Sequence, residues 1–182
     1  MDARKPIKSG HESAVIEHFM RWLAENGSLT YEVVGRPDPP DAILKAIPSY
    51  IWLEITDCYR SPEEAREEYS RVTPGETPFV HTEHPIREPD ARTAYSVLLT
   101  IAKKFTKDTY GTALKEYGPG ILICCERDPL FSDSTLSEIR DLITDHKDEL
   151  STMNGGTFRD VFLYHSAQPD GSRIFERILG FY

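Results

Sequence analysis

The pattern of hydrophobic and polar positions divides residues 11–56 into one helix and three strands. Hydrophobic side chains of the helix recur at the spacing of one helical face, at Val15, Ile16, Phe19 and Leu23. Apolar runs with the length and composition of strands follow at 29–34, 42–47 and 50–56. Only Pro48-Ser49 separates the last two runs. We therefore expect these two strands to form an antiparallel hairpin, with the more apolar third strand central in a sheet.

Three further helices are expected in the remainder of the chain, over 62–71, 91–117 and 134–150. Pro62 suits the first turn of the first of these helices. Asp133 or Ser134 is expected to cap the third. The segment 57–91 is otherwise rich in proline, which indicates a largely irregular insertion.

Three more apolar runs predict strands at 121–125, 160–166 and 173–179. A turn at Asp170-Gly171 is expected to join the last two as a hairpin. A strand meander followed by crossover helices predicts an α/β fold, with a mixed central sheet and helices on both faces. The length of 182 residues fits a single domain.

Two acidic residues of the hairpin carry the clearest chemistry. Asp41 follows Pro40 where the chain enters the hairpin, and Glu54 lies thirteen residues later on the returning strand. Because alternate side chains of a strand share a face, Glu54 points away from the face of Leu53 and Ile55. The strand is nevertheless too apolar for the face of Glu54 to be exposed to solvent, so its carboxylate needs a partner. Neighbouring carboxylates repel unless a proton or a cation lies between them. Since Mg²⁺ binds one or two carboxylates together with water and phosphate oxygens, the pair indicates a Mg²⁺ (or Mn²⁺) site.

Pro40-Asp41 followed by Glu54-Ile55-Thr56, within this order of elements, resembles the PD-(D/E)XK nuclease superfamily. The resemblance implies a restriction-endonuclease-like αβββαβ core over residues 11 to about 125, with the insertion 57–91. The segment 126–182, with its strand hairpin, would then be a C-terminal extension. The resemblance further implies a metal-dependent reaction that hydrolyses phosphodiester bonds in DNA or RNA.

The resemblance also implies the ligands of the metal. Asp41 and Glu54 would bind the ion, and the backbone carbonyl of Ile55 would complete its coordination. Many members of the family add a glutamate from the first helix. We favour Glu12, which falls in the middle of the hydrophobic stripe, over Glu17, which falls on the solvated side. The alternative for Glu12 is a glutamate that only stabilises the start of the helix.

The family's lysine is missing from its usual position, which is occupied by Thr56. A threonine cannot supply the positive charge that orients the attacking water and stabilises the transition state. We expect Lys104 to supply it, because this residue lies at the edge of the buried stripe of the long predicted helix, where its side chain can reach the sheet. Lys103 and Lys107 face away from that stripe, and Lys45 is the second choice. The alternative is a catalytically inactive module of the same fold that serves in nucleic-acid binding or protein assembly.

Charge restricts how such a protein could hold its substrate. The chain has 21 basic and 30 acidic residues and a formal net charge of −9, which opposes indiscriminate binding of nucleic acid. Residues 91–120 are nevertheless net positive, and Lys103 and Lys107 lie there. Arg60 could clamp a phosphate or could pair with glutamates of the next helix. We expect a nucleic-acid partner, with DNA favoured over RNA, to be bound weakly unless a homodimer or partner protein adds affinity.

Other features of the sequence indicate the cellular setting and a few further candidate residues. No apolar run approaches a membrane span, the N-terminus does not read as a signal peptide, and three cysteines without a disulfide pattern predict a reducing, cytoplasmic setting. His81 and His84, with Glu83 between them, could form half of a metal site. Cys124-Cys125 is expected to be buried and inert, and Tyr110 to pack in the core or near the substrate.

Overall fold

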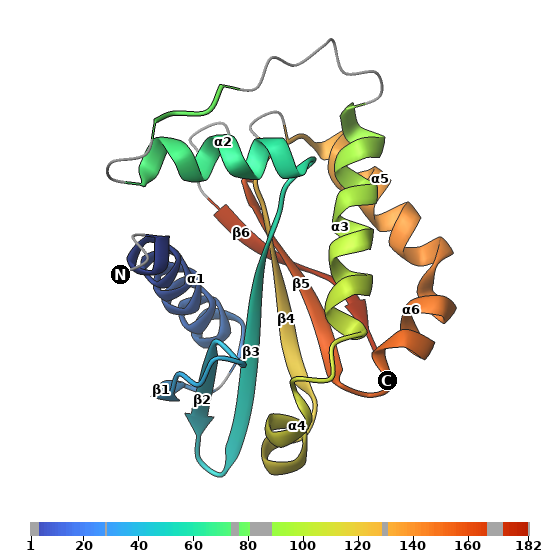
Figure 1. The fold of residues 1–182 in the computed structure, drawn as a ribbon. Helices are drawn as coiled ribbons and strands as arrows, with labels where there is room; N and C mark the ends of the chain where they lie inside the picture. Colours follow the sequence, from blue (N-terminus) through green and yellow to red (C-terminus); the bar gives the residue numbers. More distant parts are fainter. Residues whose placement is uncertain are drawn as a thin grey trace.

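Six strands form one mixed sheet in the order β1-β2-β3-β4-β5-β6 in the computed structural model (Figure 1), which describes residues 4–27, 29–73, 77–80, 89–128, 131–166 and 173–181. The strands are β1 (Glu32–Gly35), β2 (Ala42–Ala46), β3 (Ser49–Cys58), β4 (Gly120–Glu126), β5 (Phe158–Ser166) and β6 (Arg173–Gly180). The first three are antiparallel, β3, β4 and β5 are parallel, and β6 returns antiparallel. The expected α/β class and the C-terminal hairpin are confirmed.

Helices cover both faces of this sheet (Figure 1). Helix α1 (Arg4–Asn26) packs on one face, and α3 (Pro89–Phe105), α5 (Asp133–Asp145) and α6 (Lys147–Asn154) pack on the other. Helix α2 (Pro62–Val72) lies across the carboxyl ends of β3 and β4, and α4 (Gly111–Tyr117) lies at the opposite end.

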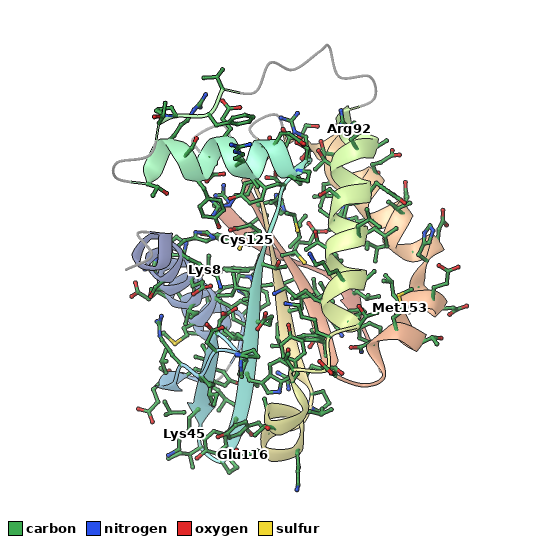
Figure 2. All side chains as sticks on the ribbon, in the orientation of Figure 1. Lys8, Lys45, Arg92, Glu116, Cys125 and Met153 are labelled. Atoms are coloured by element: carbon green, nitrogen blue, oxygen red, sulfur yellow. The ribbon has the colours of Figure 1, made fainter. Side chains whose placement is uncertain are left out.

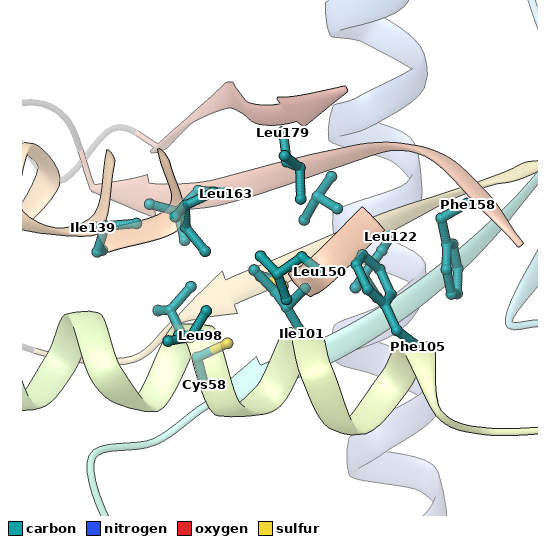
Figure 3. Close-up of a cluster of buried hydrophobic side chains, with 14 of the residues drawn as sticks. Cys58, Leu98, Ile101, Phe105, Leu122, Ile139, Leu150, Phe158, Leu163 and Leu179 are labelled. Carbon is teal, nitrogen blue, oxygen red and sulfur yellow. The ribbon is translucent and has the colours of Figure 1, made fainter. Parts of the chain in front are cut away.

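The hydrophobic core has two layers because β3, β4 and β5 are buried on both faces, and side chains fill the space on each side of the sheet (Figure 2). In one layer, the predicted stripe of α1 meets alternate residues of these strands, and Phe19 is fully buried. In the other layer, Leu98, Ile101 and Phe105 of α3 pack towards Leu122 of β4 (Figure 3). Both predicted helix stripes therefore face the sheet.

Two of the predicted helices are each broken into two. The helix expected over 91–117 ends at Phe105, and α4 begins at Gly111. Between them Tyr110 turns into the core and stacks on Trp52, with 5.4 Å between the ring centroids, and this contact redirects the chain. The helix expected over 134–150 is interrupted at His146, whose backbone leaves the helical conformation (φ −103°, ψ 13°), so α5 ends there and α6 follows.

Helix ends also differ from the prediction. Helix α1 begins at Arg4, seven residues before the predicted start, because its polar first turns carry no hydrophobic pattern. The cap of α5 is Ser132, not Asp133 or Ser134: its hydroxyl accepts from the Thr135 backbone amide in a capping box. The predicted turn at Asp170-Gly171 lies outside the described residues.

Candidate active site

Asp41 and Glu54 lie beside one another where β2 begins. Ala42 of β2 pairs with Leu53 of β3, so Asp41, one residue earlier, comes opposite Glu54. Asp41 Oδ2 accepts a hydrogen bond of 2.7 Å from the backbone amide of Ile55. Glu54 is only 5% exposed. The hairpin thus places two carboxylates in one small region of the sheet, as the sequence predicted from the strand pattern.

The Ile55 backbone is open on the side that faces Asp41. Strand β3 continues past the start of β2, so at Ile55 the neighbouring strand offers no backbone partner, and the Asp41 side chain takes the amide instead. The N–H and C=O groups of one strand residue face the same side. The Ile55 carbonyl therefore points towards the Asp41 edge, where it could serve as an oxygen ligand.

Of the candidate lysines, the structure brings Lys104 to this pair. Lys104 Nζ, on α3, lies 2.5 Å from Glu54 Oε1, and its side chain is largely buried. Lys45 lies at the far end of the hairpin, with its Nζ over the Tyr50 ring (Figure 2). Lys103 and Lys107 are exposed. The lysine that Thr56 leaves missing from β3 is therefore matched by Lys104 of α3, the helix that packs on the face of Glu54.

Glu12 lies near the pair without joining it directly. Its side chain is largely buried on the first helix and pairs with Lys8 Nζ at 3.2 Å, whereas Glu17 is exposed. The negative charge of Glu12 contributes to a raised pKa of Asp41. Within the described part of the chain, however, no three acidic side chains have their oxygens all within 4.8 Å of one another. A cation held by Asp41 and Glu54 would thus reach Glu12 through a water molecule or after a small side-chain movement.

The electrostatics of the site favour a cation. Burial, then the charge of Glu54 and that of Glu12, raise the pKa of Asp41 to about 7, although the Ile55 amide acts in the opposite direction. Glu54 Oε2 is buried, and of the side-chain cations only Lys104, at the other carboxylate oxygen, is within ion-pair distance of Glu54 in the described residues. The available donors are carboxylate and carbonyl oxygens, which are the ligands that Mg²⁺ prefers. The residues present therefore fit a Mg²⁺ or Mn²⁺ ion.

Tyr110 closes one side of the site, a role that its sequence position alone did not reveal. Its hydroxyl is buried, and burial, then the charge of Glu54 and the contact with its carboxylate, raise the pKa of Tyr110. The ring is held by stacking on Trp52. Tyr110 therefore excludes solvent beside Glu54 and keeps a neutral hydroxyl there.

The raised pKa of Asp41 predicts that the metal-free protein loses stability as pH rises. The pKa of this carboxyl is about 7 in the fold against an ordinary value of 3.8, so between these values the folded state keeps a proton that the unfolded state has lost. Urea denaturation in chelator should show an unfolding free energy that falls from about pH 4 to about pH 8 by at least ~1 kcal/mol more in the wild type than in Asp41→Asn. Mg²⁺ should remove this difference. Equal pH profiles for the two proteins would contradict the raised pKa.

Of the three residues expected to contact nucleic acid, Arg60 is paired within the protein, whereas Lys103 and Lys107 are exposed. Arg60 is largely buried and its Nη2 lies 2.8 Å from Glu64 Oε1, so the structure shows the alternative pairing with a glutamate of the next helix. Lys103 lines a cleft of about 850 Å³ between the start of α2 and the outer side of α3, together with Arg92 and Thr100. Thr100 lies one helical turn before Lys104, so this cleft adjoins the candidate active site. Lys107 follows α3 and is exposed.

The other sequence candidates are placed away from this pair or lie outside the described residues. The segment with His81, Glu83 and His84 lies outside the described residues. All three cysteines are buried and free of disulfides. None of the helices in the described ranges is long and apolar enough to cross a membrane.

Comparisons with protein-family models, with curated proteins and with solved structures found no match to this chain. The resemblance to PD-(D/E)XK nucleases is therefore carried by the motif at Asp41 and Glu54 and by the order of the elements around it. What the fold and the site define is an α/β protein with a mixed sheet, in which a partly buried Asp41, a buried Glu54 and Lys104 lie together where β2 begins.

Proposed function

We propose that this protein is a metal-dependent nuclease that hydrolyses phosphodiester bonds, with DNA as the favoured substrate over RNA. The observation that supports the proposal best is the contact of Lys104 with Glu54, beside Asp41, in a chain whose motif has Thr56 at the usual lysine position. The contact supplies the charge that the motif itself lacks.

Each residue of the site has a role in this proposal. Asp41, Glu54 and the Ile55 carbonyl would hold Mg²⁺ or Mn²⁺, with Glu12 as an outer ligand. The bound ion would neutralise phosphate charge and make water a stronger nucleophile. The Lys104 ammonium, positioned by Glu54, would donate hydrogen bonds to the attacking water and to a phosphate oxygen as negative charge develops there.

The substrate would approach along α3. Lys103 and Lys107 are exposed there, and Arg92 lines the same cleft as Lys103. These cations are few and the net charge of the chain is −9, so binding should be weak and should fall steeply with salt. A homodimer or a partner protein would add the missing affinity. Tight binding of duplex DNA by the isolated chain at physiological salt would contradict this expectation.

The proposal is tested by incubating the purified protein with supercoiled plasmid and with labelled single-stranded DNA and RNA, in Mg²⁺ or Mn²⁺ and in chelator. We expect cleavage that requires the metal ion. Cleavage that continues in chelator would overturn the metal-dependent reaction. If Mg²⁺ binds by calorimetry but no substrate is cut, the inactive nucleic-acid-binding or assembly module, to which Thr56 points, replaces the enzyme.

A further inference from the structure

A second group of potential metal ligands lies at the carboxyl ends of β3 and β4, on the face covered by α1. Asp57 and Cys125 are partners in the β3–β4 register, so their side chains stand next to each other on one face of the sheet. Helix α1 lays His11 over both. One ligand atom from each of the three side chains lies within 4.8 Å of the other two, and His11 Nε2 is 3.2 Å from Asp57 Oδ1.

We propose that His11, Asp57 and Cys125 form a Zn²⁺ site, separate from the candidate Mg²⁺ site at Asp41 and Glu54. An imidazole, a carboxylate and a thiolate are the donors that Zn²⁺ takes, whereas Mg²⁺ avoids sulfur. Three protein ligands would leave one tetrahedral position for water. Binding breaks the S–H bond of Cys125, whose proton goes to solvent, and forms a bond from sulfur to zinc without any redox change.

The burial of the cluster favours a bound ion over solvent. Cys125 is completely buried, and His11 Nε2 is a buried nitrogen whose contact is Asp57 Oδ1. Zinc bonds of about 2.0–2.3 Å place ligand atoms about 3.4–3.8 Å apart. Side-chain rotations alone can therefore bring these three atoms from their present separation into a zinc shell.

Neighbouring groups hold Asp57 in place. Arg127 Nε donates to Asp57 Oδ1 at 2.9 Å, and the Tyr69 hydroxyl donates to Oδ2 at 3.4 Å. Such outer partners commonly fix the carboxylate ligands of metal ions. Arg127 Nη1 also lies 3.7 Å from Glu68 Oε1, so the charge of Arg127 is partly balanced by a second carboxylate.

A zinc ion here would tie α1 to the sheet close to the candidate active site. His11 directly precedes Glu12, and Asp57 follows Glu54 by three residues on the same strand. The ion would therefore fix the helix turn that carries Glu12. The inference does not depend on nuclease activity, because its ligands and its readout differ from those of the Mg²⁺ site.

The test is titration of the chelator-treated full chain with Co²⁺ and then with Zn²⁺. We expect one equivalent of Co²⁺ to produce a sulfur-to-cobalt charge-transfer band, Zn²⁺ to remove it by displacement, and Zn²⁺ to raise the melting temperature. Cys125→Ala should lose the band. The matched control Cys58→Ala, which changes a buried cysteine on the other face, should keep it.

A second variant covers the case in which Cys125→Ala does not fold. His11→Gln alters a partly exposed side chain and should weaken Zn²⁺ binding at least about tenfold in competition with a chromogenic chelator. The absence of a sulfur-to-cobalt band in the wild type, or an unchanged band in Cys125→Ala, would overturn the site. Mg²⁺-dependent cleavage is measured separately, so the two proposals fail independently.

Discussion

Asp41→Asn is expected to lower the rate of metal-dependent cleavage by about 10³-fold or more. Metal ions supply several kcal/mol of transition-state stabilisation, and each 1.36 kcal/mol corresponds to about a tenfold change in rate. The asparagine keeps the shape of the side chain and an oxygen that can accept from the Ile55 amide, but it removes the charge that attracts the cation. The measurement is the initial rate of plasmid nicking, together with calorimetric Mg²⁺ binding.

The variant should fold at least as well as the wild type in chelator. Asparagine resembles the protonated carboxyl, and the raised pKa of Asp41 indicates that the metal-free fold favours the protonated form. A loss of activity would therefore not reflect unfolding. Asp108→Asn, at an exposed position, is the matched control and should cleave like the wild type. Wild-type rates in Asp41→Asn would show that this carboxylate does not bind the metal required for cleavage.

The fold could be predicted where the information is local. Strand alternation and helix stripes depend on neighbouring residues, and the predicted stripe of α1 is buried at Val15, Ile16 and Phe19 and partly buried at Leu23. The breaks between helices could not be predicted in the same way. The first depends on Tyr110 stacking on Trp52, a contact between residues far apart in the chain. The second is a change of backbone conformation at His146 that leaves the hydrophobic periodicity intact.

The candidate site likewise contains contacts that could be predicted from local sequence patterns and contacts that could not. The proximity of Asp41 to Glu54 follows from the hairpin register, and the approach of Lys104 follows from its place at the edge of a buried helix face. The neighbours of Asp57 had no such signal. Arg127 lies 70 residues away, and His11 reaches Asp57 only because α1 crosses the sheet at that point.

Lys104→Met is expected to lower the cleavage rate by about 10²–10³-fold, the effect of removing one donor that stabilises developing charge in an active site. Mg²⁺ binding should persist, because methionine removes a cation from beside the carboxylates and takes away no ligand. Lys103→Met, at the adjacent exposed position, is the control and should mainly weaken substrate binding at higher salt. A Lys104→Met enzyme with the wild-type rate would show that the relocated lysine is not catalytic.

The same substitution also tests how Glu54 and Lys104 depend on each other in the fold. Breaking a buried ion pair from one side costs about 3–5 kcal/mol, because an unpaired charge remains. In chelator, Lys104→Met and Glu54→Gln should each lower the unfolding free energy by about this amount, while the double variant should lose much less than the sum of the two. In saturating Mg²⁺ the cation should replace the lysine as partner of Glu54, so Lys104→Met should regain stability but not activity. That combination would assign Lys104 to catalysis. If the lysine were purely structural, its substitution would lower stability and activity together, and Mg²⁺ would restore both.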